Sequence, residues 1–85
     1  MTMTREQVAE RAPDALFADG FDDCLIGTVR RFNDTVALYD YEKVIAVLMK
    51  DGLNRMDAEE HFDFNIVGAW VGENTPAFAT MGEGK

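Results

Sequence analysis

Two short runs rich in β-branched and aromatic residues, separated by a turn sequence, constrain this chain more than any other feature. Residues 24–29 read Cys-Leu-Ile-Gly-Thr-Val and residues 35–39 read Thr-Val-Ala-Leu-Tyr, with Asn33-Asp34 between them. Such runs favour strands, and a turn signal between them favours an antiparallel β-hairpin. Gly27, inside the first run, predicts a bulge or a close backbone approach.

The clearest helix is predicted over residues 41–50, directly after the hairpin. Its apolar residues fall at helical spacing on one face: Tyr41, Val44, Ile45 and Leu48. Asp40 precedes the run as an N-cap, and Gly52 follows it as a left-handed stop. The hairpin therefore leads straight into an amphipathic helix.

A second helix is predicted to open at Asn54, with Asp57 three residues later completing a cap-like pair. Its buried face is expected to follow four-residue spacing: Ala58, Phe62, Ile66 and Ala69. Because the linker between the helices has only three or four residues, they should be antiparallel neighbours. Residues 77–79 are predicted to form a last short edge strand. The predicted fold class is thus α+β, a hairpin with a pair of antiparallel helices and a short C-terminal strand.

The N-terminal part is predicted to be helical over residues 1–21. Thr4 and Gln7 form a capping box before a run of good helix formers. Pro13 interrupts this helix, and residues 13–18 could form one further turn. The 85 residues, 47% of them hydrophobic, make one domain with a real core and a flexible tail at 80–85.

Acidic residues dominate the charge, and they concentrate in the last part of the chain. The net charge is −8, and residues 51–85 carry seven acids against two bases. Such a surface is repelled by phosphates, so direct nucleic-acid or anionic-membrane binding is not expected. It suits a basic protein partner, although acidity can also serve solubility alone. The absence of a membrane-length apolar run or a secretory signal pattern, together with a single cysteine, indicates a cytoplasmic protein.

The residues needed for catalysis are scarce. The chain has no serine, one cysteine (Cys24) and one histidine (His61), and the last two fall in different predicted elements. A cysteine nucleophile needs a neighbouring base, so Cys24 is interpreted as a structural residue. The prediction is a protein that is not an enzyme and needs no cofactor.

One pair of residues has the spacing of metal ligands. Asp57 and His61 are four apart and would share a helix face, with Glu60 beside it. A protein site needs three or four ligands, and the chain has no second histidine. A solvated acidic helix face explains the same residues, so no metal site is predicted.

The candidate site consists of four acids within seven residues: Asp57, Glu59, Glu60 and Asp63. They are expected to cover a broad face of the second helix, opposite its apolar residues, where they would imitate a run of phosphates to a basic groove. Trp70, shortly after this helix, is either a core anchor or an interface hot spot. The predicted partner-binding residues are Asp57, Glu59, Glu60, Asp63, Trp70 and Glu73.

The second half of the chain resembles small phage- and prophage-encoded proteins that have no established activity. The resemblance covers residues 39–43, 57–65 and 68–76, and the closing Gly-Ala-Trp-Val-Gly-Glu-Asn-Thr-Pro is its most distinctive part. It implies a mobile-element origin. Small acidic phage proteins include anti-CRISPR inhibitors and DNA mimics, and the likeness to anti-CRISPRs is one of size, charge and setting.

Two hypotheses of function follow from these patterns. The leading one is a phage-type, anti-CRISPR-like inhibitor that occupies a basic nucleic-acid-binding surface of a host protein in the bacterial cytoplasm. The alternative is a homodimeric accessory protein of phage or bacterial origin with no inhibitory role, associated through Trp70 and apolar strand edges.

Overall fold

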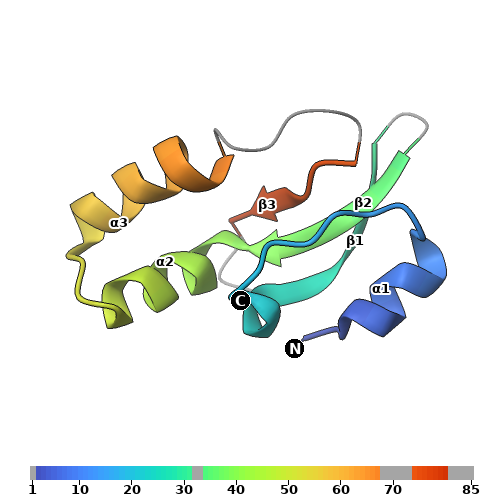
Figure 1. Cartoon of the computed structure of the whole chain (residues 1–85), viewed down its shortest axis with the longest axis horizontal. Coiled ribbons are helices and arrows are strands. Elements are labelled where there is room, and N and C mark those ends of the chain that lie inside the picture. Colours follow the sequence, from blue (N-terminus) through green and yellow to red (C-terminus); the bar gives the residue numbers. More distant parts are fainter. Residues whose placement is uncertain (1, 32–33, 68–73, 81–85) are drawn as a thin grey trace.

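The computed structural model of the chain describes residues 2–31, 34–67 and 74–80. The described part has an α+β fold, as predicted, with helices and strands arranged as in Figure 1. Its α-helices are α1 (Arg5–Arg11), α2 (Tyr41–Lys50) and α3 (Arg55–His61), and its strands are β1 (Leu25–Arg31), β2 (Asp34–Asp40) and β3 (Ala77–Ala79). A 3-10 turn, η1 (Asp22–Cys24), precedes β1, and a π-helical segment, η2 (Phe62–Val67), continues α3.

The three strands form one mixed sheet in the order β1-β2-β3. β1 and β2 are the predicted antiparallel hairpin. The predicted C-terminal strand is also present, and it pairs parallel to β2, with Leu38 opposite Ala77 and Asp40 opposite Ala79. Parallel neighbours need a crossover between them, and here the crossover contains α2, α3 and η2. The helical pair is therefore tied to the sheet at both ends.

The hairpin register shows the bulge that Gly27 predicts. Leu25 lies opposite Tyr39, but Gly27 lies opposite Leu38, so the register shifts between Leu25 and Gly27. A Cβ at Gly27 would lie 3.8 Å from the sulfur of Met3, which is ordinary contact distance. The N-terminal residues thus pass close to the bulge, and the Met3 N–H donates to the Leu25 carbonyl at 2.9 Å.

Each α-helix begins at a residue whose side chain caps it. Thr4 accepts from the Gln7 N–H at 3.1 Å, and the Gln7 side chain accepts from the Thr4 N–H at 2.9 Å, the predicted capping box. Asp40 and Asn54 cap α2 and α3 by accepting from N–H groups three residues later. After α2, Gly52 adopts a positive φ of 113°, the left-handed conformation expected of a helix stop.

The N-terminal segment is less helical than predicted. Helix α1 ends at Arg11, and the chain from Pro13 to Ala18 makes a turn and then an irregular stretch with no helix. The reason is long-range hydrogen bonding. The Leu16 N–H donates to the Asn74 carbonyl at 3.2 Å, and the Ala18 N–H donates to the Tyr39 hydroxyl at 2.8 Å. Those donors are therefore unavailable to a helix, and the segment lies across the sheet in Figure 1. Residues 81–85 of the predicted tail lie outside the described residues.

The core lies between the sheet, helices α2 and α3, and the N-terminal segment that contains α1. Val44, Ile45 and Leu48 of α2 are buried, as the apolar spacing predicts. A chain of aromatic contacts joins the elements. Tyr39 stacks on Phe78 with ring centroids 5.4 Å apart, and Phe62 meets Phe78 edge to face at 4.8 Å. These contacts hold the α3–η2 segment against the sheet.

No helix in the described ranges is both long enough and apolar enough to cross a membrane.

Candidate functional site

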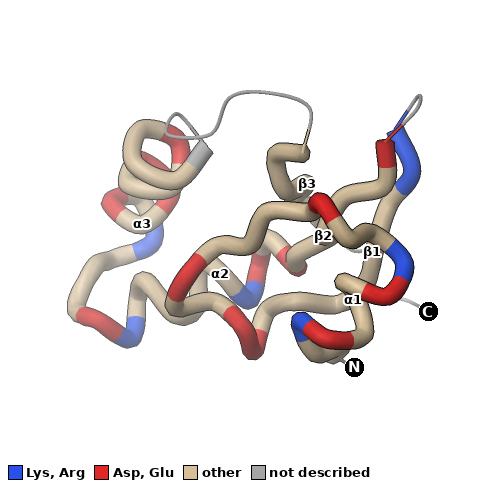
Figure 2. Tube along the Cα trace, turned by 45° about the vertical axis from the view of Figure 1, so that its right-hand side comes forward, with Lys and Arg blue, Asp and Glu red and all other residues tan. Residues whose placement is uncertain are grey.

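The four acids predicted as the binding site lie on the α3–η2 segment, opposite its buried face. Three residues form that buried face, with exposed fractions of 0%, 4% and 8%: Ala58, Phe62 and Ile66. Asp57, Glu60 and Asp63 are exposed, and Glu59 is half-buried. The four-residue spacing of the apolar side thus orients the acids outward, as predicted. Figure 2 shows acidic positions recurring along α3, and also spread over other elements.

Glu59 differs from the other three acids because it belongs to an ion-pair cluster centred on Arg55. The Arg55 Nε donates to Glu59 at 2.9 Å, and the two Nη atoms donate to the Glu42 carboxylate at 2.8 and 2.9 Å. The hydrogen bonds from Arg55 lower the pKa of Glu42. Since Glu42 lies on α2, this cluster ties the first turn of α3 to the first turn of α2. Glu59 therefore has a structural partner. Arg55 and Glu59 are four residues apart, so helical spacing held a signal for this pair.

Asp57, Glu60 and Asp63 make no ion pair within the described part of the chain. We call these three residues the acidic strip. Arg55 is the only lysine or arginine of α3, and it is already engaged by two carboxylates. Among the described residues, the strip consequently presents negative charge to solvent with no lysine or arginine paired to it.

The negative charges of the α3–η2 segment also act on Tyr41, the first residue of α2. Tyr41 packs edge to face on Phe62, with ring centroids 4.9 Å apart. Its pKa is raised first by burial and then by the negative charges of Glu59 and Asp63. The hydroxyl proton of Tyr41 is therefore harder to remove than that of free tyrosine, first because of burial and then because of these two acids.

His61, which together with Asp57 has the spacing of metal ligands, contacts Asn65 rather than an acid. The Asn65 Nδ2 lies 3.3 Å from the His61 Nδ1. Among the described residues, no three histidine, cysteine, aspartate or glutamate side chains come together as metal ligands.

Two predicted site residues, Trp70 and Glu73, lie outside the described residues. The structure instead brings two apolar side chains to the acidic face. Met56 and Phe64 are 70% and 79% exposed. The sequence held a signal for them, because neither belongs to the series 58, 62 and 66 that lines the buried face. Sequence reasoning did not use it.

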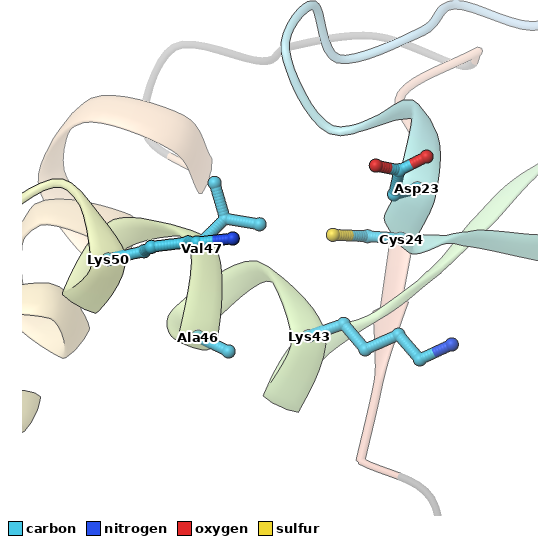
Figure 3. Close-up of a pocket in the computed structure, with 6 residues that line it drawn as sticks. All are labelled: Asp23, Cys24, Lys43, Ala46, Val47 and Lys50. Atoms are coloured by element: carbon cyan, nitrogen blue, oxygen red, sulfur yellow. The ribbon is translucent and has the colours of Figure 1, made fainter.

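A separate hollow of about 280 Å³ lies between η1 and α2. Its lining residues are Asp23, Cys24, Lys43, Ala46, Val47 and Lys50. Figure 3 shows the Cys24 sulfur pointing from η1 toward α2. Burial raises the pKa of this thiol, and Asp23 raises it further. Because no histidine lines the hollow to act as a base, its geometry does not assemble a cysteine nucleophile.

No family model, curated protein or solved structure matches this chain. The geometry of the α3–η2 segment therefore carries the functional proposal, and the resemblance to phage proteins stays a prediction.

Proposed function

We propose that this chain is a small acidic protein that acts by binding, and that its α3–η2 segment occupies a basic nucleic-acid-binding surface of a host protein. The observation that carries the proposal is the acidic strip: Asp57, Glu60 and Asp63 are exposed and have no ion pair in the described ranges. The nearby Arg55 is held by Glu42 and Glu59 and cannot neutralise them.

The spacing of the strip supports imitation of a nucleic-acid backbone. Its acids follow one another at three-residue intervals, which is roughly 4.5 Å along a helix axis. Phosphates of one DNA strand follow one another about every 3.4 Å along the duplex axis. A basic groove that neutralises phosphates would therefore meet negative charges at a comparable interval, on an element held by the Arg55 cluster and the Phe62 contacts.

The biological setting that we propose is that of a phage-type inhibitor, anti-CRISPR-like in size and charge, working in the cytoplasm of a bacterial host. Its support is the 85-residue length, the net charge of −8 and the resemblance of residues 39–76 to phage-encoded proteins. By occupying the basic surface, such a protein would exclude the nucleic acid from the host protein. The role requires binding only and no catalytic step.

Self-association is the alternative function. Its support is the position of β1 at one edge of the sheet, since an edge strand can pair with a second copy. Light scattering over a range of concentrations distinguishes the two, because a concentration-independent monomer removes the homodimer.

The proposed function is tested by capture from bacterial lysate on the immobilised chain. We expect retention of a protein that binds DNA or RNA by itself, and we expect it to be released when salt rises from about 50 mM to about 200 mM, because charge contacts of this kind are screened. In the test variant, Asp57, Glu60 and Asp63 are changed to lysine, which should abolish retention. In the control variant, Glu6, Glu10 and Asp14 are changed to lysine, which alters the net charge equally but leaves the strip intact. If the retained proteins are not nucleic-acid binders, or are held equally at both salt concentrations, the proposed function is wrong.

A further inference from the structure

Met56 and Phe64 are the most exposed large apolar side chains in the described part of the chain. Their exposed fractions are 70% and 79%, whereas the next two, Leu16 and Met49, are 42% and 41% exposed. Scattered surface hydrophobic residues are ordinary. This pair is different because both members lie on the same segment as the acidic strip.

The helical geometry places Met56 and Phe64 on one line with Glu60. The three residues are four apart, as are the buried residues 58, 62 and 66 on the opposite side. In a regular α-helix, residues four apart drift by about 40°. The π-helical winding of η2, with hydrogen bonds to the fifth residue, has more residues per turn and offsets that drift. Along this exposed line, apolar Met56 is followed by acidic Glu60 and then by apolar Phe64. Asp57 and Asp63 lie on either side of the line.

We propose that Met56 and Phe64 are the apolar anchors of the interface, and that the partner offers an apolar hollow rimmed by lysine and arginine side chains. This inference rests on the proposed function, because it describes the partner of the same surface. It adds a second kind of contact. Phosphate imitation alone would need only charge, whereas an aromatic ring that is 79% exposed supplies apolar area to bury.

Charge complementarity favours a partner with a basic-rimmed hollow over a second copy of the chain. Two copies meeting through this face would bring Asp57, Glu60 and Asp63 against the same acids of the partner, since such an interface is self-complementary. Like charges brought together in this way oppose association. An anionic lipid surface is disfavoured for the same reason. A basic-rimmed hollow satisfies both the apolar anchors and the acids around them.

The test compares Phe64→Ala and Met56→Ala with the wild-type chain, using the protein retained in the lysate capture as the probe. Calorimetry at about 50 mM and about 200 mM salt gives the affinity and its salt dependence. We expect Phe64→Ala to weaken binding about thirtyfold or more, the effect of a hot-spot side chain, by a similar factor at both salt concentrations. Leu16→Ala, at an exposed apolar residue on another segment, is the matched control and should leave the affinity unchanged.

The outcomes separate this inference from the proposed function. If lysine at the acidic strip weakens binding but Phe64→Ala does not, the anchor proposal is overturned and the proposed function stands. If neither change matters, both are overturned. If Phe64→Ala instead converts a dimer of the chain to a monomer in sedimentation, this face binds a second copy of the chain, and the proposal of a basic partner is wrong. Circular dichroism of each variant confirms that the fold is retained.

Discussion

Changing Asp57, Glu60 and Asp63 together to lysine should abolish binding of the partner. Each replacement adds two positive charges, so the net charge of the chain rises from −8 to −2 and the strip becomes basic. Like charges placed against each other across an interface cost several kcal/mol, so we expect the affinity to fall roughly a thousandfold or more. The three side chains are exposed and unpaired in the described ranges, so the change should leave the fold intact. Calorimetric titration of the retained protein measures the loss.

One comparison makes this result specific to the strip. The variant with Glu6, Glu10 and Asp14 changed to lysine has the same net charge, and its exposed positions lie in the N-terminal part of the chain. It should bind nearly as well as the wild type. Glu59 is left unchanged in both variants because it pairs with Arg55, so its reversal would also disturb the joint between α2 and α3. Equal weakening in the two variants would show that net charge alone matters.

Removing the hydroxyl of Tyr39 should destabilise the fold by about 1–3 kcal/mol, the cost of leaving a buried donor without its acceptor. Tyr39 is fully buried, and its hydroxyl accepts a hydrogen bond of 2.8 Å from the Ala18 N–H. Burial raises the pKa of Tyr39, so the hydroxyl keeps its proton at neutral pH. In Tyr39→Phe, the Ala18 N–H, on a residue only 4% exposed, would lose this partner. Chemical denaturation measures the free energy of unfolding.

Tyr41→Phe is the matched control for this change. Tyr41 is half-buried and contacts Phe62 through its ring, which phenylalanine keeps. We expect a change in unfolding free energy within about 0.5 kcal/mol, as for surface substitutions. If Tyr39→Phe is as stable as Tyr41→Phe, the Tyr39–Ala18 hydrogen bond does not hold the N-terminal segment to the sheet.

Local signals predicted the fold where short-range chemistry decides it. The hairpin, the caps at Thr4, Asp40 and Asn54, and the buried faces of the helices follow from side chains a few residues apart. The parallel pairing of β3 could not be read in this way, because it depends on the path of the whole crossover. The irregular stretch before Ala18 escaped prediction for a similar reason, since its acceptor belongs to Tyr39, 21 residues later.

In the candidate site, too, some features follow from local spacing and others from long-range contacts. Spacing placed Asp57, Glu60 and Asp63 on the outer side of α3–η2. The pairing of Glu59 with Arg55, four residues earlier, follows from helical spacing, whereas the bonds from Arg55 to Glu42, 13 residues earlier, do not. The exposure of Phe64 follows from spacing, since residue 64 lies outside the series 58, 62 and 66 that faces the core. The Arg55 cluster therefore reduces the predicted acidic set by Glu59, and the same spacing adds an apolar component to it.

The proposed function requires that the α3–η2 segment and a nucleic acid compete for one surface of the partner. Fluorescence anisotropy of a labelled DNA oligonucleotide bound to the retained protein measures this directly. Adding the wild-type chain should release the DNA completely, with one chain displacing one DNA from each site, and the lysine-substituted strip should release none. If the chain and the DNA are bound together, so that the anisotropy stays high at saturating chain, the two do not compete for one surface and the proposed function is contradicted.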